Sequence, residues 1–422
     1  MKNKKCITKK VFALFFLLIF LIILSGCTKS HHEVDDFAYA VAIGVDEGKD
    51  DNLEITLSFA NPNAIGGGND SGKASGGSDN LINFTVESSG IFNALNIAND
   101  NISKIVNLSH VKLVLFSEEV AKKGIRKYID GFVRELSVRP ATIVAVCDNS
   151  CKDYLKSITP KLEANPEKYI NDIFDKSKTA FLPSATLSDF FVWGDSKSKD
   201  VTTAYLGRLK DEKKSDAKKD KEEYSYGIDY EKTDNVPLEA KNKAVVFGTA
   251  FFDGYKLAGT GTSIENMYLK LLTGKISEAV YTVKIKNDAM IELSLTQENK
   301  PEFKIDTSHY APKVQINVDI QADIMSMEDT VIKKGSYKVL SDALENDLEK
   351  NINKYLYKIV RDLKVDSVGI GNEAKRNFLT MQEWKKYDWH KKYPFLQYET
   401  KVNVKIKKFG LIDKSLDIGN EG

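Results

Sequence analysis

From residue 37 onward, the chain alternates between segments with the period of a strand and segments with the period of a helix. Between residues 53 and 60, apolar side chains occupy every second position, which predicts a strand with one buried face. The apolar segment 37–46 is expected to pair with it. Further strands are predicted over 82–88, 111–116 and 141–147, and helices over 91–103 and 117–131. This irregular order favours an α+β or mixed α/β fold over a regular doubly wound sheet.

The second half of the chain adds strands and two helices. Thr262 and Glu265 have the spacing of a capping box, which predicts that a helix starts there and ends near residue 273. Strands are predicted over 243–252, 280–286, 291–296, 313–320 and 401–407. The strands between 278 and 320 follow one another directly, as in an antiparallel sheet. We therefore predict an α+β, multidomain protein with mixed or antiparallel sheets packed with helices.

The longest helical pattern lies near the C-terminus, between residues 340 and 363. Its apolar side chains recur every three or four residues and form one stripe. The stripe consists of Leu340, Leu344, Leu348, Ile352, Leu356, Ile359 and Leu363. We interpret it as the core-facing side of a long amphipathic helix. The alternative is a coiled coil that binds a partner.

The amino-terminal segment has the three parts of a signal peptide. Five lysines precede an unbroken apolar run of fourteen residues, Val11 to Leu24, and small residues follow it. A membrane-spanning helix needs about 20 apolar residues, so a retained anchor is the weaker alternative. The segment ends in Leu-Ser-Gly-Cys, which matches the bacterial lipobox, in which the cysteine is acylated and becomes the first residue. We predict Cys27 to be the lipidation site, and hence a lipid bilayer to be a partner.

Two polar stretches interrupt the periodic segments. Residues 66–80 are rich in Gly, Ser and Asn and are expected to form a flexible loop. Residues 210–223 hold six basic and six acidic side chains and no large apolar one, so they cannot bury a core. The predicted division is a signal peptide (1–26), a lipid-anchored tether (27–36), one or more N-terminal α+β domains (37–209), a charged linker or loop (210–240) and a C-terminal α+β domain (241–415).

Charge and cysteine content narrow the possible partners and chemistry. The full chain carries a net charge of +1, and loss of the five signal-peptide lysines leaves about −4, which argues against nucleic-acid binding. Cys147 and Cys151 could form a disulfide if their segment turns, but two free thiols are the preferred interpretation.

The C-terminal region is locally basic. Between Ala374 and Gly410 there are ten basic residues and three acidic ones. We call this region the basic island, and four aromatic residues lie among its lysines: Trp384, Tyr387, Trp389 and Tyr393. Three interpretations are possible: a surface that binds anionic lipid head groups, a surface that binds an acidic partner, or solvated lysines around two core tryptophans.

Motifs for catalysis or cofactor binding are incomplete. Residues 67–74 approach a P-loop, but Ala74 replaces the hydroxyl that would bind magnesium. Gly369, Gly371 and Ala374 fit G-x-G-x-x-A, yet they follow a long helix, which predicts a turn. Metal ligands are available in the tether, where solvation is the preferred interpretation: His31, His32, Glu33, Asp35 and Asp36. We therefore expect no catalytic residue, no cofactor and no metal site.

Five segments, taken in order, resemble the Ger(x)C family, the lipoprotein C subunits of nutrient germinant receptors in endospore-forming bacteria. They are the lipobox, "EVDDFAYAVAIGVD", "HVKLVLFSEEVAKKGIRKYIDGFVRELSVRP", "AVVFGTAFFDGYKLAGTGTSIENMYLKLLTGK", and the long helix with "VDSVGIG" and the tail "WKKYDWHKKYPFLQYETKVNVKIKKFG". The resemblance implies a membrane-anchored, non-catalytic protein on the outer face of the inner spore membrane, needed for nutrient-triggered germination. The implied partners are an A subunit with membrane and soluble parts and a permease-like B subunit.

Two other functions fit the sequence less well. A solute-binding lipoprotein of a transporter would also carry a lipobox cysteine, but it typically has two lobes with parallel sheets and regular strand-helix alternation. An exported hydrolase would need a nucleophile beside a base, and no such pair stands out in the sequence.

Overall fold

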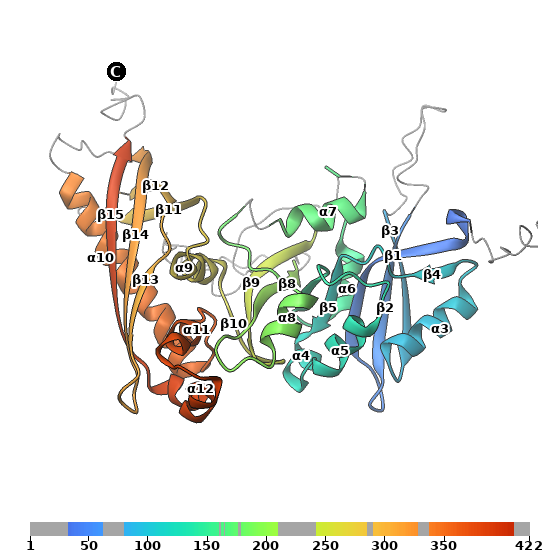
Figure 1. Ribbon diagram of the computed structural model, residues 1–422. Helices are drawn as coiled ribbons and strands as arrows, with labels where there is room; N and C mark the ends of the chain where they lie inside the picture. Colours follow the sequence, from blue (N-terminus) through green and yellow to red (C-terminus); the bar gives the residue numbers. More distant parts are fainter. Residues whose placement is uncertain are drawn as a thin grey trace, which may run out of the picture.

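The computed structural model describes residues 33–61, 80–159, 162–163, 165–175, 179–209, 242–284, 290–327 and 337–408. The fold is α+β and multidomain, as predicted, and contains a ten-stranded and a five-stranded sheet. Figure 1 shows the two sheets side by side, with the larger one built mainly from the first half of the chain.

The large sheet is mixed. Its order is β10-β9-β8-β6-β5-β1-β2-β3, with β4 paired to β1 and β7 to β6. The four central strands β1, β5, β6 and β8 are parallel, whereas the strands at both ends are antiparallel. The strands are β1 (Phe37–Glu47), β2 (Leu53–Ala60), β3 (Leu81–Ser88), β4 (Ile105–Asn107), β5 (Leu113–Ser117), β6 (Ile143–Cys147), β7 (Ala185–Thr186), β8 (Thr202–Arg208), β9 (Ala244–Asp253) and β10 (Lys256–Gly261).

Helices cover both faces of the large sheet. On one face lie α3 (Ile91–Asn101), α4 (Glu118–Lys123), α5 (Arg126–Arg134) and α8 (Leu187–Trp193), and on the other lie α6 (Cys151–Ser157) and α7 (Pro166–Ile173). The expected pairing of β1 with β2 is confirmed. The expectation of one buried face for residues 53–60 was wrong. Because both faces of the sheet are covered, β2 also buries its polar residues Thr56 and Ser58, which bond to the side chains of Thr85 and Asn83 on β3.

One helix prediction was wrong in its extent. The segment 117–131 forms two helices, α4 and α5, rather than one. Gly124 lies between them with a φ of +111°, a conformation that side chains with a Cβ rarely adopt and that ends α4. Gly124 also lies against Lys256 of β10, so the break brings the helices down onto the sheet edge.

The small sheet has the order β11-β12-β14-β13, with β15 parallel to β14, and its other pairings are antiparallel, as predicted for 278–320. Its strands are β11 (Ala279–Lys284), β12 (Met290–Thr296), β13 (Glu302–Asp306), β14 (Lys313–Met327) and β15 (Gln397–Lys408). The predicted capping box starts α9 (Ser263–Thr273): Thr262 and Glu265 bond to each other's backbone N–H groups.

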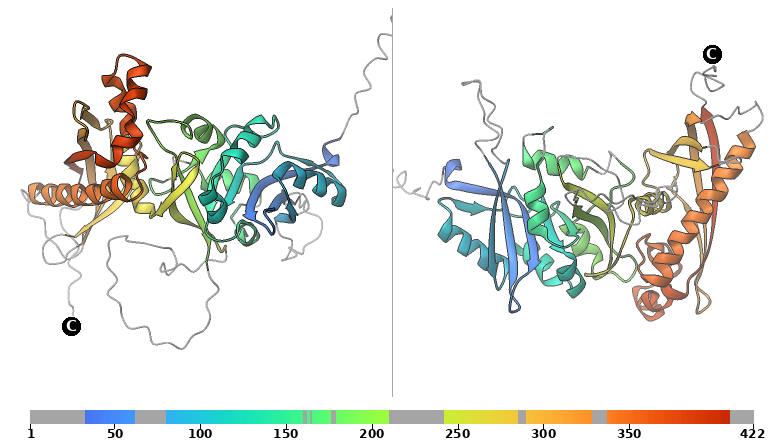
Figure 2. Two further views of the ribbon diagram at one scale, coloured as in Figure 1. Left: turned by 90° about the horizontal axis from the view of Figure 1, so that it is seen from below. Right: turned by 180° about the vertical axis from the view of Figure 1, so that it is seen from behind.

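The long helix packs into the core of the small sheet. It consists of α10 (Tyr337–Tyr357) and a π-helical turn, η4 (Lys358–Asp362), and Figure 2 shows it alongside β15. Six of the seven stripe residues, from Leu340 to Ile359, are buried, and Leu363 is half-buried, which confirms the core-packing interpretation. Two carboxylates of α10, Glu345 and Glu349, accept the backbone N–H groups of Val404 and Val402. The helix thereby also protects the outer edge of β15.

Strand β9 joins the two sheets. It follows the charged segment 210–240, yet it pairs with β8 and extends the large sheet. Ala250 and Phe252 point into the core beneath the large sheet, while Phe251 points the other way, into the core of the small sheet. The ring of Phe251 lies 6.3 Å from that of Tyr355 on α10. The division of the chain into domains at 210–240 therefore stays a prediction, since hydrogen bonding continues across it.

Several predicted segments lie outside the described residues: the signal peptide, Cys27, the loop 66–80 except its last residue, and the charged linker 210–240. Among the residues that are described, no helix combines the length and apolar character that crossing a bilayer requires.

The core position of α10 can be tested by Leu348→Asp. Leu348 is fully buried, so an unpaired carboxylate there should lower the free energy of unfolding by about 3 kcal/mol or more. Lys350→Asp, on the exposed side of the same helix, is the matched control and should change it by less than about 0.5 kcal/mol. Urea unfolding followed by circular dichroism measures both. Equal effects from the two variants would contradict the packing described here.

Candidate functional site at the junction of the two sheets

The two sheets are joined by a polar cluster around Asp200 and Asp366. Asp200 lies between α8 and β8, and Asp366 lies just after the long helix. The backbone N–H of Asp200 donates to the carbonyl of Asp366 at 3.0 Å, and the N–H of Asp366 donates to Oδ2 of Asp200 at 2.8 Å. Ser198 also donates its hydroxyl to the side-chain oxygen of Asn372 at 2.6 Å. These bonds attach the segment before β8 to the turn after the long helix.

The carboxylate of Asp366 organises that turn. It accepts the backbone N–H groups of Gly369, Ile370 and Gly371 at 2.8, 2.8 and 2.7 Å, and the indole N–H of Trp389 at 3.0 Å. Gly369 has a φ of +81°, which favours glycine. A Cβ on Gly371 would lie 2.5 Å from the indole nitrogen of Trp389, so a larger residue cannot fit. The turn predicted at this G-x-G-x-x-A motif is found only at Gly369, because Ile370 begins the short helix α11 (Ile370–Ala374), whose first N–H groups bind the chain's own carboxylate.

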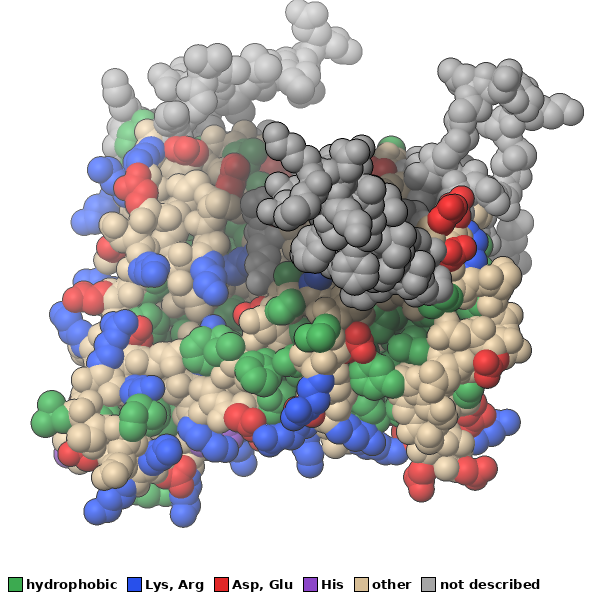
Figure 3. Space-filling view, turned by 45° about the vertical axis from the view of Figure 1, so that its right-hand side comes forward, with side chains coloured by type: hydrophobic (Ala, Val, Ile, Leu, Met, Phe, Trp, Pro, Cys, Tyr) green, Lys and Arg blue, Asp and Glu red, His purple; other side chains and the backbone are tan. Residues whose placement is uncertain are grey.

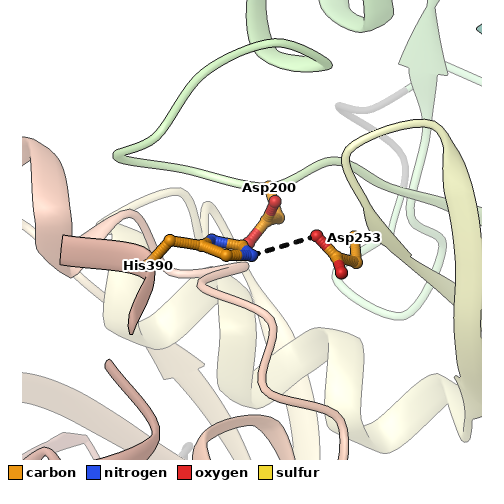
Figure 4. Close-up of side chains that lie close together, drawn as sticks. All are labelled: Asp200, Asp253 and His390. Atoms are coloured by element: carbon orange, nitrogen blue, oxygen red, sulfur yellow. Dashed lines mark ion pairs between the residues drawn. The ribbon is translucent and has the colours of Figure 1, made fainter. Parts of the chain in front are cut away.

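A second set of ionisable groups lies next to this pair. His390, on α13 (Trp389–Lys392), points its Nε2 at Oδ1 of Asp253 at 3.1 Å. Asp253 is at the end of β9, and Oδ1 of Asp200 accepts the backbone N–H of the next residue, Gly254, at 3.3 Å. Figure 4 shows the end of the imidazole close to the carboxylates of Asp200 and Asp253, which come from separate parts of the chain.

Burial and pairing shift the pKa values of these groups in different directions. Burial raises the pKa of Asp366 to about 6, and the nearby Asp200 contributes to this. Burial also raises the pKa of Asp200. The hydrogen bond between His390 and Asp253 raises the pKa of the imidazole and lowers that of the carboxyl. The His390–Asp253 pair therefore favours its charged form, whereas burial disfavours the charge on the other two carboxylates.

The sequence did not single out these residues as a site. Asp366 becomes important because Gly369 to Gly371 turn back toward it, and an aspartate three residues before a glycine-containing turn is the local signal that could have indicated this. Asp200, Asp253 and His390 carry no such signal, since only the fold brings them together. The arrangement clamps segments of the chain together, and we assign it no catalytic chemistry.

The residues that the sequence did single out lie elsewhere. Cys27, His31, His32 and residues 67–74 are outside the described residues. Glu33 precedes a short 3-10 helix that contains the tether residues Asp35 and Asp36, and its N–H donates to the Asp36 carboxylate. Cys147 and Cys151 are both buried and unbridged, which confirms the interpretation as free thiols.

The aromatic residues of the basic island belong to the core. Trp384, on α12 (Met381–Tyr387), and Trp389 are both buried, and so is Tyr393. Lys392 lies 3.7 Å from the ring centroid of Tyr387 in a cation–π contact. The tryptophans are therefore core residues, which confirms that part of the interpretation as solvated lysines around two core tryptophans. The buried rings are not available to lipid head groups.

Replacing Asp366 by Asn should loosen the junction. The amide has the same shape, but it cannot accept four N–H donors as an anion does, so buried donors would lose their partner. We expect a loss of about 2 to 4 kcal/mol in the free energy of unfolding. The control is Asp362→Asn, four residues earlier on an exposed side chain, which should have almost no effect. Thermal unfolding compares the two, and an unchanged Asp366→Asn variant would refute the role given to this carboxylate.

Comparison with known proteins agrees with the resemblance. The family described as "Spore germination protein N-terminal domain" matches residues 30–208, and "Spore germination B3/ GerAC like, C-terminal" matches residues 247–410. Spore germination protein KC of Bacillus subtilis (strain 168) is 24% identical over 413 residues, which are 94% of this chain and 95% of that protein. Spore germination protein A3 of the same organism is 21% identical and covers 93% of this chain and 96% of its own length.

A solved structure has the same fold. The crystal structure of the GerBC protein matches with a TM-score of 0.53 at 14% identity, over 86% of this chain and 96% of that chain. Two family matches that follow each other along the chain, full-length relatives and a shared fold lead to one conclusion: this chain belongs to the Ger(x)C family of spore germination proteins.

Proposed function

We propose that this chain is the lipid-anchored C subunit of a spore germinant receptor and that it acts in nutrient-triggered germination without catalysis. The observation that carries this proposal is the order of the two family matches, 30–208 and 247–410, which together span the region after the lipobox. Relatives named as spore germination proteins match over nearly their whole length, so the similarity is not limited to a single shared domain.

The membrane part of the proposal rests on the amino-terminal sequence. Cys27 ends a short apolar run, and only nine residues, 28–36, separate it from the start of β1 at Phe37. Even fully extended, this tether reaches about 35 Å, and the 3-10 helix at Val34–Asp36 shortens it. A diacylglycerol on Cys27 would therefore keep the large sheet close to the bilayer. The proposed location is the outer face of the inner spore membrane.

The non-catalytic part is supported by the state of the described ionisable groups. Cys147 and Cys151 are buried, and burial raises the pKa of the Cys151 thiol, so this thiol stays protonated and poorly nucleophilic. The carboxylates at the junction are occupied by backbone N–H groups of the turn and by His390. A binding and signalling role is what these features favour.

The surface offers contact area for receptor A and B subunits, the proposed partners. Figure 3 shows hydrophobic side chains gathered in the centre of one face, with Lys and Arg side chains along its lower edge. Large exposed hydrophobic residues on the helices over the large sheet include Phe92, Phe191 and Val192, and Leu136 lies in the turn after α5. Apolar surface rimmed by charge is typical of protein interfaces.

The lipid anchor can be tested by Cys27→Ala. The thiol lies outside every predicted helix and strand, so the fold should remain intact. The variant would lose the acyl chains, however, and each buried CH₂ of these chains contributes about 0.8 kcal/mol to membrane binding. We expect the protein to leave the membrane fraction and nutrient-triggered germination to weaken. Cys6→Ala, within the signal peptide, is the control and should change neither. Unchanged membrane retention of the Cys27→Ala protein would mean that the apolar run itself anchors the chain.

The basic island can be tested with lysines that do not support packing. Lys385, Lys386 and Lys391 are exposed, whereas Lys392 packs on Tyr387, so only the first three should be replaced by Gln. If they face a membrane, each contributes about 1 kcal/mol to binding of anionic vesicles, and the loss should be larger at low salt. The charge-matched control replaces three exposed lysines of α10, Lys338, Lys350 and Lys354. Binding to vesicles and to the A and B subunits is measured for both triple variants. Equal binding by the two would contradict an interaction through the basic island and would show that its lysines are only solvated.

Gene order separates this proposal from its alternative. Neighbouring genes for A and B receptor subunits are expected, whereas a neighbouring ABC permease would favour a solute-binding lipoprotein.

A further inference from the structure

The junction between the sheets has an excess of buried negative charge. Asp200 and Asp366 are 3% and 2% exposed, and the carboxylates of Asp200 and Asp253 both lie beside the single imidazole of His390. Within the described part of the chain, neither Asp200 nor Asp366 forms an ion pair with a lysine or arginine, and His390 is the basic group that acts on Asp200. Carboxylates that are buried in proteins are usually paired or bound to a metal ion. This charge distribution therefore favours a bound cation.

Three of these side chains converge as ligands would. Asp200, Asp253 and His390 each offer one ligand atom, and the three atoms lie within 4.8 Å of one another (Figure 4). Ligands at about 2.0 to 2.2 Å from a tetrahedral zinc ion are separated by about 3.4 Å, so a modest contraction would complete the geometry. The side chain of Asp253 is 57% exposed and can make this movement without disturbing the core.

The surroundings of the three ligands support the same interpretation. The carboxylate of Asp200 is oriented by the N–H groups of Asp366 and Gly254, which are the kind of outer-shell bonds that hold a metal ligand in place. Each carboxylate oxygen has two lone pairs, so these bonds leave Asp200 able to bind an ion. The side chain of His390 is 33% exposed, which gives an ion access from solvent and leaves room for a water ligand.

We propose that Asp200, Asp253 and His390 form a binding site for a divalent transition-metal ion such as Zn²⁺, which would link the large sheet to the helices that follow the long helix. An imidazole with two carboxylates is a mixed nitrogen and oxygen donor set, which suits Zn²⁺ better than Ca²⁺ or Mg²⁺. Lys197 and Lys256 act on the charge of Asp253 and oppose the ion, so the affinity is expected to be moderate. The imidazole must lose its proton to bind, so affinity should fall as the pH is lowered.

The test is a calorimetric titration of the full-length protein in detergent with Zn²⁺, together with its melting temperature. His31 and His32 are replaced by Gln in every sample, because the tether offers a separate set of possible ligands. The variants are His390→Gln and Asp253→Asn, whose side chains are partly exposed and whose replacement should leave the fold intact by circular dichroism. The matched control is His309→Gln. His309 lies 3.9 Å from Asp306 on an exposed surface, and no third ligand was found there among the described residues.

We expect one saturable Zn²⁺ site that raises the melting temperature. Its affinity should fall by about tenfold or more in both junction variants and stay unchanged in His309→Gln. Three results would overturn the proposal: no saturable binding of Zn²⁺, binding that His390→Gln and Asp253→Asn leave intact, or equal affinity for Ca²⁺. Since neither the lipid anchor nor the receptor role enters this experiment, its outcome is independent of the proposed function.

Discussion

The buried carboxylate of Asp366 is the contact on which the arrangement of the two sheets depends. Its four N–H donors come from the turn that follows the long helix and from Trp389, and its own backbone bonds to Asp200 beside the large sheet. A hydrogen bond to a charged group is worth more than one between neutral groups, and a donor left without its acceptor in a buried site is costly. The turn, the indole and the segment before β8 are therefore held in one geometry.

The apolar core reinforces this polar clamp. Strand β9 belongs to the large sheet, but Phe251 points into the core of the small sheet, while its neighbours Ala250 and Phe252 point into the core beneath the large sheet. The ring of Phe251 packs against Tyr355 of the long helix, whose hydroxyl bonds to that of Ser367 beside Asp366. The two sheets thus share a strand, an aromatic contact and a hydrogen-bonded turn. Separating them would expose apolar surface and break the hydrogen bonds between Asp366 and Asp200.

The sequence predicted the elements whose pattern is local. The long helix from Leu340, the strand over residues 53–60 and the capping box at Thr262 were each predicted from residues close together in the sequence, and each is found in the structure. Only the single buried face expected for 53–60 was wrong. The break at Gly124 and the strand β8 were missed. The first depends on a single glycine. The second, Thr202–Arg208, is buried on both faces and shows no simple alternation of apolar and polar residues.

The junction could not be predicted in the same way. Asp200 and Asp366 are 166 residues apart, and nothing in the neighbourhood of either residue indicates the other. The sequence predicted a turn at the glycines 369 and 371, but it could not show that a short helix begins at Ile370 or that the N–H groups here bind a carboxylate of this chain. For the tryptophans, the sequence left a core position and an exposed surface as alternatives, and only the tertiary packing, which buries both rings, decides between them.

The central claim is that this junction holds the two sheets together as one unit, and amide hydrogen exchange of the folded protein measures it most directly. The amides of Gly369, Ile370 and Gly371 lie at the start of a short helix, where no carbonyl of the helix accepts them, and they donate instead to a buried carboxylate. They should therefore exchange as slowly as the amides of β9 and should open together with them. Rapid exchange at the amides of these three residues, while the amides of β9 and α10 stay protected, would contradict the claim.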